Sequence, residues 1–540
     1  MMLSTFHGLE AAKRGMMTQQ AALYVTGHNV ANANTPGYTR QRVNFVTTEP
    51  FPAPALNRPQ IPGQMGTGVT AGSIERVREY FLDIQYRGEN NKLGYWEARA
   101  DAVAKMEDIM NEPSDSGLAK TMDQFWQALE DLSVNPENEG ARSVVRQRGL
   151  AVVETFHYLA NSLSQIQADI GTQIGVTVTQ INSLAKQISE LNQQIASVEP
   201  NGYLPNDLYD ERDRLIDELS KLINVQVEKH QTGGNAPATA EGTYDIYFLN
   251  GNEKVYLVQG GNFQSISFPD GQDVDGDKDH IQEMPPAAGV TILQAGGTTV
   301  SFTSNNQATF PMGKLRGLIE AYGYVVQDSN NQPIVTGIYP DMLNNLDKLA
   351  YTFGKLFNAV HEKGYGLNGE TGVSFFDGLD QVKGAAKTID LSDDIINDLA
   401  NIAASTEKDK PGNGNNAINL ANVGSMPLSA DTVSLIGTTN TIQISTLNLP
   451  LTSGTIQTNY QGWIGKLGVD GEQANRMKNN SDVLRQSVEE RRQSVSSVSL
   501  DEEMMNMIKF QHAYNAAARQ ITVVDEMLDK IINGMGIVGR

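Results

Sequence analysis

Few residues of the 540-residue sequence have the types and spacing that catalysis or metal binding would require. The stretch His361–Tyr365, HEKGY, begins like the zinc-protease motif HExxH, but a tyrosine stands where the second histidine ligand is needed. We interpret it as the polar end of a helix. Two loose GxGxxA patterns, at Gly66–Ala71 and Gly412–Ala417, follow no convincing strand of a βαβ unit, and we interpret both as turns.

An acidic segment at Asp270–Asp279, DGQDVDGDKD, has the composition of a calcium-binding loop. An EF-hand has glycine at position six, after acidic residues at positions one, three and five. Counting back from Gly276 puts Gly271 at position one, so that pattern fails and a solvated acidic turn is the simpler interpretation. Incidental calcium binding stays open as an alternative. The sequence therefore predicts no catalytic residue, no metal ligand and no cofactor, and we expect the protein not to be an enzyme.

The composition excludes several further classes of protein. The formal net charge of −22 argues against a nucleic-acid partner, which would select a basic surface. The absence of cysteine rules out disulfides and thiolate chemistry. No apolar run approaches the roughly 18–20 residues of a membrane-spanning helix, so membrane insertion is not expected. The N-terminal residues lack the basic and apolar regions of a cleaved signal peptide, so any export would use another route.

Helices are predicted at both ends of the chain, each with one apolar stripe. The N-terminal stripe is interrupted by Gln19 and Thr26, and the chain then turns sharply at Thr35-Pro36-Gly37. The N-terminal seam consists of Leu9, Ala12, Met16, Leu23 and Val30. The C-terminal seam, with regular three–four spacing, consists of Met504, Met507, Phe510, Tyr514, Ala517, Ile521, Val524, Leu528 and Ile531.

Two helices that pair along one face have little core, so other molecules must cover the remaining apolar surface. The methionines at the start of the C-terminal helix suit either an internal core or a seam between molecules, and we favour the seam. Arg40 and Arg42 are expected at the surface, with an ion pair between subunits as the alternative.

The middle of the chain predicts a multidomain α+β fold. Apolar residues keep heptad spacing over residues 153–198, which predicts a helix about 70 Å long. Asn250-Gly251 between two alternating runs predicts a β-hairpin. The expected domains are a terminal coiled coil (1–35 with 500–540), an extended connector (36–90), a long helical bundle (91–365 with 461–499) containing a β-rich insertion at about 225–310, and an outer β-rich domain (366–460).

The turn after the first helix carries a family resemblance. NVANANTPGY resembles the NxANxxTxGY motif of bacterial flagellar axial proteins, which include rod, hook and hook-associated proteins. SLDEEMMNMIKFQHAYNAAARQ is similar to their C-terminal motif, and the central segments NDLYDERDRLIDELS and GKLRGLIEAYG resemble the hook-associated members. Rod and hook proteins lack that central helical block. The residues that match the turn motif are Asn29, Asn32, Asn34, Thr35, Pro36, Gly37 and Tyr38.

The resemblance implies a structural role at the junction between hook and filament, where the protein would support filament growth from flagellin. It implies terminal helices that line the inside of a tube, with the β-rich domains outside. The implied partners are further copies of the chain in a ring or helical assembly, the hook protein, a second hook–filament junction protein and an export chaperone. The implied location is extracellular, reached through the flagellar type III channel without a cleaved signal. The alternatives are a hook or distal-rod subunit, or a secreted hydrolase on an axial scaffold.

Overall fold

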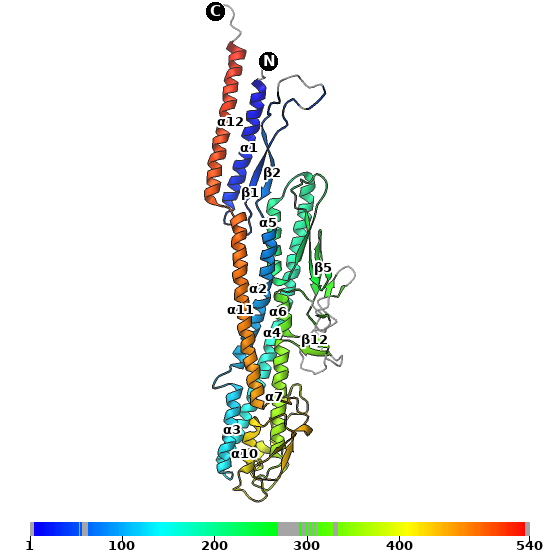
Figure 1. Ribbon diagram of the computed structural model, residues 1–540, viewed down its shortest axis with the longest axis vertical. Helices are drawn as coiled ribbons and strands as arrows, with labels where there is room; N and C mark the ends of the chain where they lie inside the picture. The colour runs from blue at the N-terminus through cyan, green and yellow to red at the C-terminus, as the bar shows by residue number, and fades with distance from the viewer. Residues whose placement is uncertain are drawn as a thin grey trace, which may run out of the picture.

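The computed structural model of the chain is an elongated molecule with both chain ends at one tip (Figure 1). It describes residues 5–52, 54–56, 63–267, 291–293, 298–299, 303–304, 307–308, 310–327 and 333–534. Long helices dominate, and the described strands form several small antiparallel sheets. The multidomain α+β fold predicted from the sequence is therefore confirmed. No helix among the described residues is long and apolar enough to cross a membrane.

At the tip, two helices lie side by side with a β-hairpin beside them (Figure 1). The helices run antiparallel, since α1 leads away from the tip and α12 returns to it. The hairpin strands pair antiparallel, with a register shift between Asn44 and Phe45. We call these elements and the turn at residues 32–40 the terminal unit. Its elements are α1 (Thr5–Ala31), β1 (Gln41–Thr47), β2 (Val69–Arg76) and α12 (Leu500–Gly534).

Below the terminal unit, five helices form the shaft of the molecule (Figure 1). The longest, α4, begins where the Asn138 side chain accepts a hydrogen bond from the Ala141 N–H and so caps the first turn. It has 60 residues, which corresponds to about 90 Å, and its apolar heptad positions lie in the core. The shaft consists of α2 (Tyr80–Met110), α4 (Glu139–Val198), α5 (Asn206–Leu222), α6 (Lys314–Tyr322) and α11 (Ile456–Ser496).

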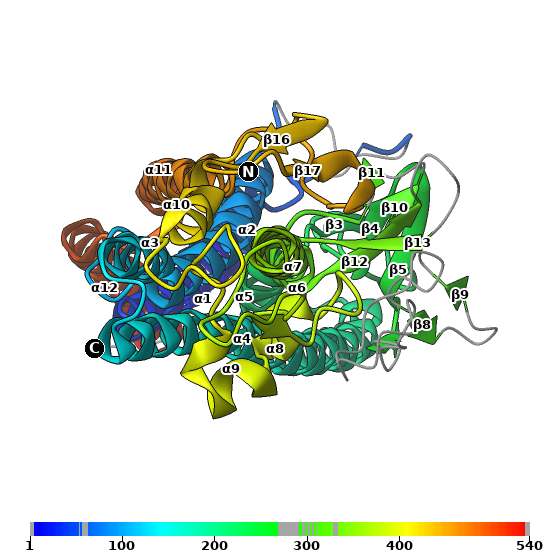
Figure 2. The ribbon, with the colours of Figure 1, turned by 90° about the horizontal axis from the view of Figure 1, so that it is seen from below.

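A β-rich insertion lies on one side of the shaft (Figure 2). Its main sheet has the order β3-β4-β5-β6, and β4 and β5 are the hairpin predicted around Asn250-Gly251, where Gly251 has φ +61°. The strands are β3 (Gln226–His230), β4 (Thr243–Asn250), β5 (Glu253–Gln259), β6 (Asn262–Phe263), β7 (Ser265–Ser267), β8 (Thr291–Leu293), β9 (Thr298–Thr299), β10 (Thr303–Ser304) and β11 (Gln307–Ala308). The acidic segment 270–279 lies outside the described residues.

The end of the molecule farthest from the chain termini, which we call the foot, combines short helices with short strand pairs (Figures 1 and 2). Residues 366–460 contain only brief strands, because their alternating runs are short and separated by Gly, Asn and Ser. The foot contains α3 (Leu118–Val134), the end of α7 (Ile338–His361), β14 (Phe376–Asp377), α8 (Ala385–Thr388), β15 (Asp390–Leu391), α9 (Asp393–Asn397), α10 (Asn415–Ala421), β16 (Thr432–Ser434) and β17 (Thr441–Gln443). Above it, β12 (Tyr324–Gln327) pairs with β13 (Pro333–Thr336).

Three helices begin earlier than their apolar patterns predict. α4 begins at Glu139, and α11 begins at Ile456, where Thr455 and Thr458 form a capping box. The first turns of α2 lie in the segment expected to be an extended connector. They escaped prediction because most of the residues buried there are charged, such as Asp83 and Arg87, and Leu82 alone makes no apolar stripe.

Candidate assembly site: the terminal helix pair and its joint with the shaft

The two predicted seams lie in the terminal unit, where α1 packs against α12. In the N-terminal seam Ala12 is buried, and Leu9, Met16, Leu23 and Val30 are half-buried. In the C-terminal seam Met504 and Ile531 are exposed, with relative exposures of 53% and 49%. The remaining C-terminal seam residues are half-buried: Met507, Phe510, Tyr514, Ala517, Ile521, Val524 and Leu528.

The β-hairpin also covers part of the C-terminal seam. The ring of Phe45 on β1 meets the ring of Phe510 edge to face, with 5.9 Å between centroids. On the other side, α1 approaches α12 closely at Gly15, where an added Cβ would lie 4.0 Å from the Cβ of Ala517. The seam residues therefore pack among α1, α12 and β1. These elements do not cover the helix pair completely.

The turn motif is organised by the buried side chain of Asn29. Its Nδ2 donates to the Gln41 carbonyl at 2.8 Å and to Glu503 Oε2 at 3.2 Å. Its Oδ1 accepts from the Gln41 N–H at 3.0 Å and from the Tyr38 hydroxyl at 2.8 Å. One side chain thus joins the end of α1, the start of β1 and the start of α12. Because the Tyr38 hydroxyl donates to Asn29, it accepts from His28 Nδ1 at 2.9 Å.

The remaining motif residues form the turn itself. Thr35 donates from its hydroxyl to Asn32 Oδ1 at 3.2 Å, and Asn32 Nδ2 donates to the His28 carbonyl at 3.1 Å. Gly37 has φ +84°, which glycine adopts without steric cost and other residues do not. The side chains of Asn34 and Pro36 are exposed. The sequence motif therefore divides into residues that hold the turn and residues on its outer surface.

Arg40 is not the surface residue that the sequence predicts. Its Nε lies 2.7 Å from Glu503 Oε1, its Nη2 lies 2.8 Å from Glu502 Oε1, and its N–H donates to the Ser496 carbonyl at 2.9 Å. Burial would lower the pKa of Arg40, but its hydrogen bonds to Glu502 and Glu503 raise it above its usual value. The sequence pattern failed here because the acidic partners lie more than 450 positions away along the chain.

A second charged cluster lies where the hairpin meets the shaft. The helix α5 presents acidic side chains at three–four spacing, and Arg76, the last residue of β2, is inserted among them. Arg76 Nη1 lies 2.7 Å from Asp210 Oδ1 and 3.0 Å from Asp213 Oδ2, and Nη2 pairs with Glu241. The Arg76 side chain is only 3% exposed.

The pKa values of two carboxyl groups in this cluster shift in opposite directions, although burial raises both. Burial would raise the pKa of Asp213, but the guanidinium groups of Arg78, Arg76 and Arg87 hold it well below its usual value. Burial raises the pKa of Asp210, only partly offset by Arg76 and by the Thr39 N–H, which donates to Asp210 Oδ2 at 2.8 Å. The cluster is therefore a charge-balanced, buried network rather than a solvated acidic surface.

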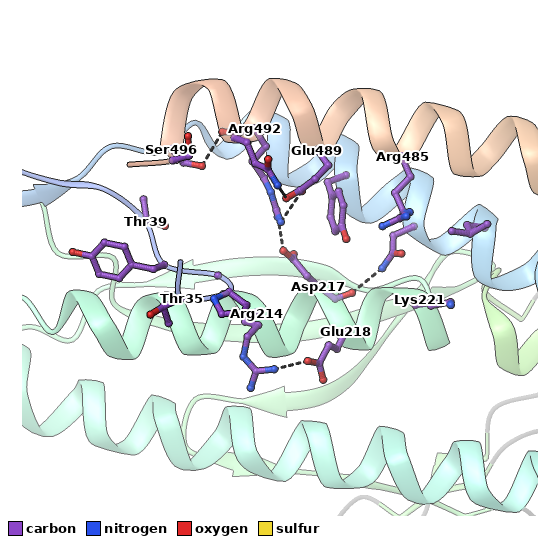
Figure 3. A pocket seen from close by; sticks show the side chains of 18 of the residues that line it. Thr35, Thr39, Arg214, Asp217, Glu218, Lys221, Arg485, Glu489, Arg492 and Ser496 are labelled. Carbon is purple, nitrogen blue, oxygen red and sulfur yellow. Dashed lines mark hydrogen bonds and ion pairs between the residues drawn. The ribbon is translucent and has the colours of Figure 1, made fainter. Parts of the chain in front are cut away.

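A cavity of about 890 Å³ opens between the turn, α5 and the end of α11. Figure 3 shows Asp217 reaching toward Arg492 of α11, with which it forms an ion pair, while Arg214 pairs with Glu218 along α5. The cavity is lined by charged groups of both signs and by the outer surface of the turn. Such a lining of charged and polar groups differs from the mostly apolar lining that is typical of small-molecule sites.

The histidine of the HEKGY segment serves the core of the foot. His361 lies at the end of α7, where burial lowers its pKa to about 4. The Val373 carbonyl accepts from Nδ1 at 2.7 Å, and Nε2 accepts from the Ala403 N–H at 2.9 Å. Both ring nitrogens are thus engaged within the chain. Among the described residues no cluster of His, Asp and Glu is arranged to hold a metal ion.

Comparison with known proteins identifies the family. The model of the "Flagellar hook-associated protein FlgK helical domain" matches residues 103–376. The models "Flagella basal body rod protein" and "Flagellar basal body rod FlgEFG protein C-terminal" match residues 9–39 and 491–534, which include the turn and most of α1 and α12. The central match is thus to a model named for the hook-associated protein, whereas the two terminal matches are to models named for rod proteins.

Individual relatives agree with these matches. The chain is 43% identical to flagellar hook-associated protein 1 of Bacillus subtilis over the whole of both chains. It is 29% identical to the protein of that name from Salmonella typhimurium, over 68% of this chain and 58% of the relative. The structure of the flagellar hook junction protein FlgK from Burkholderia pseudomallei has the same fold, with a TM-score of 0.55, 14% identity, and coverage of 77% of this chain and 100% of that chain. The chain belongs to the flagellar hook-associated protein 1 (FlgK) family.

Proposed function

We propose that this chain connects the flagellar hook to the filament and supports growth of the filament from flagellin. The family is a structural one of the flagellum, and the single observation that carries the assembly mechanism is the incomplete burial of the terminal helix pair. Large apolar side chains remain exposed on both of its helices. They are Phe6, Met17 and Tyr24 on α1, and Leu500, Met504, Met505, Ile508, Val523, Met527, Ile531 and Ile532 on α12.

Exposed apolar surface of this extent favours association, because covering it removes it from water. Neighbouring copies of the chain would cover it in a ring or helical assembly, with the N-terminal and C-terminal seams forming the wall of a tube. The hook protein would contact this assembly on one side, and a second junction protein would contact it on the other. An export chaperone would protect the same surface before assembly, and export would proceed to the cell exterior without a cleaved signal. The foot and the β-rich insertion would lie outside the tube.

Deletion of residues 505–540 tests this function. The shortened chain keeps the shaft and the foot, whose cores do not include α12. We expect it to be exported and largely folded but unable to cap the hook, so that flagellin is lost to the medium. A control deletion removes residues 431–443 of the foot, which carry β16, β17 and the buried side chains of Leu435 and Ile442 and take no part in the terminal unit. Normal filaments on cells that carry only the 505–540 deletion would overturn the proposal.

A further inference from the structure

The terminal unit and the shaft are joined by only two covalent connections. The chain leaves β2 for α2 through residues 77–79, and it leaves α11 for α12 through residues 497–499. The extensive packing of α1 is with α12, β1 and β2, all within the terminal unit. Figure 1 shows most of the terminal unit above the shaft, with the upper end of the shaft beside the β1–β2 hairpin and with α12 continuing from α11 after a break.

Hydrogen bonds and ion pairs link the two sides of this joint, and among the described residues the hydrophobic core of the shaft includes no residue of the terminal unit. The start of α5 supplies most of these contacts on the shaft side. Asn206 Nδ2 donates to the Ile74 carbonyl at 3.0 Å, and Gln41 Nε2 donates to Asp207 Oδ1 at 3.1 Å. On the other side of the joint, the Arg40 N–H donates to the Ser496 carbonyl. These hydrogen bonds restrain the orientation of the terminal unit relative to the shaft. None of them involves a large apolar side chain.

Arg76 is the most deeply inserted group of the joint. It extends from the end of β2 into the shaft, where it meets Asp210 and Asp213 of α5 and Glu241 of the insertion. Its guanidinium also lies over the Tyr209 ring, 5.2 Å from the centroid. A planar guanidinium with several partners in fixed directions restrains orientation more strongly than an ammonium group would.

A joint of this kind has a physical consequence. An apolar interface resists opening because opening exposes apolar surface to water, whereas the charged groups of this joint can be hydrated if they separate. We propose that the terminal unit is a separately orientable part, and that Arg76, seated on the acidic stripe of α5, holds it in the orientation seen here. This inference concerns the single chain and does not depend on the proposed function.

The absence of cysteine from the chain allows a direct test by spin labelling. One label pair spans the joint, with Asn475→Cys on α11 and Gln511→Cys on α12; a second pair lies within the shaft, with Gln187→Cys on α4 and Asn475→Cys. All three positions are exposed. Pulsed electron paramagnetic resonance then gives the distribution of distances for each pair in the purified full-length chain.

We expect a narrow distribution across the joint in the parent chain, and its replacement by a broad one in Arg76→Gln. The shaft pair should stay narrow in both. Arg42→Gln is the matched control, because it removes the same charge from an exposed position on β1 of the same hairpin. It should leave both distributions unchanged.

Three results would overturn the proposal. They are an Arg76→Gln distribution as narrow as that of the parent chain, equal broadening in Arg42→Gln, and a broad distribution already in the parent chain. If the shaft pair shows that Arg76→Gln disturbs the shaft, Arg76→Lys decides the question. Lysine keeps the positive charge but lacks the planar guanidinium and its several hydrogen-bond donors. We therefore expect the distance distribution to broaden for the pair across the joint and not for the pair within the shaft. An unchanged distribution across the joint would contradict the proposal that Arg76 holds the terminal unit in place.

Discussion

The foot and the terminal unit, at opposite ends of the molecule, differ in how far their large apolar side chains are buried. In the foot, Phe125, Phe353, Phe357, Phe375 and Phe376 are almost fully buried against one another, with neighbouring ring centroids as close as 4.8 Å. In the terminal unit, α12 leaves Met505 65% exposed. The aromatic core of the foot is closed by its own chain, whereas the described part of the terminal unit leaves large apolar side chains exposed. If the proposed function holds, stability and assembly depend on different ends of the molecule.

The largest effect on the isolated chain should come from the foot. Phe357→Ala removes a ring packed among Phe125, Phe375 and Phe376 and should lower the local free energy of unfolding by about 3–5 kcal/mol. Phe510→Ala, at the half-buried seam, should cost only about 1 kcal/mol in the isolated chain. Hydrogen exchange of peptides from α7 and α12 measures each effect separately, and equal losses at the two ends would refute the contrast.

The second effect is a pH dependence of the foot that comes from one buried histidine. Burial lowers the pKa of His361 to about 4, so the folded foot keeps this histidine neutral while the unfolded chain binds a proton below pH 6.5. The unfolded state then binds more protons, and the stability of the foot should fall by up to about 3 kcal/mol as the pH drops from 6.5 to 4. Urea unfolding at several pH values measures the slope. His361→Gln serves as the control, and a variant that keeps the full slope would rule out His361 as its source.

The third effect lies at the turn of the terminal unit. Gly37→Val must adopt φ near +84°, at a local cost of roughly 1–2 kcal/mol. We expect the melting temperature of the shaft to change little, while the number of filament-bearing cells falls sharply because every subunit must repeat the turn. Gly27→Val is the matched control for stability, since Gly27 lies within α1 and has open space at its Cβ position. A shaft that melts earlier in proportion to the loss of filaments would show that the turn acts on overall stability instead.

The smallest change in the free energy of unfolding is expected for a substitution on the exposed face of α12, which should nevertheless impair assembly clearly. Met505→Ser and Val144→Ser each replace an exposed apolar side chain, the first on α12 and the second on α4 near the foot. Both should alter the free energy of unfolding by no more than about 0.5 kcal/mol. Retention of flagellin on the cells should fall for Met505→Ser and stay normal for Val144→Ser. Equal retention for the two variants would mean that exposure alone does not mark the assembly surface.

The sequence predicts the parts of the molecule whose determinants are local. Heptad spacing predicts α4, Asn250-Gly251 predicts the β4–β5 hairpin, and the three–four stripes predict both terminal helices. The joint could not be predicted in the same way. Arg76 and Arg40 find their partners through contacts between distant segments, and an acidic stripe on a helix normally indicates a solvated face. Only the regular three–four spacing of Asn206, Asp210, Asp213 and Asp217 on α5 could have drawn attention to it.

The hydrogen bond between Asn29 and Glu503 spans 474 positions of the sequence, and this separation determines when the terminal unit can form. Contacts between such distant segments form slowly, and α1 cannot find its partner before α12 has been synthesised. The shaft and the foot can fold without α12, but the helix pair cannot. A chain truncated before Leu500 would therefore lack α12, and the seam of α1 would have no partner within the chain.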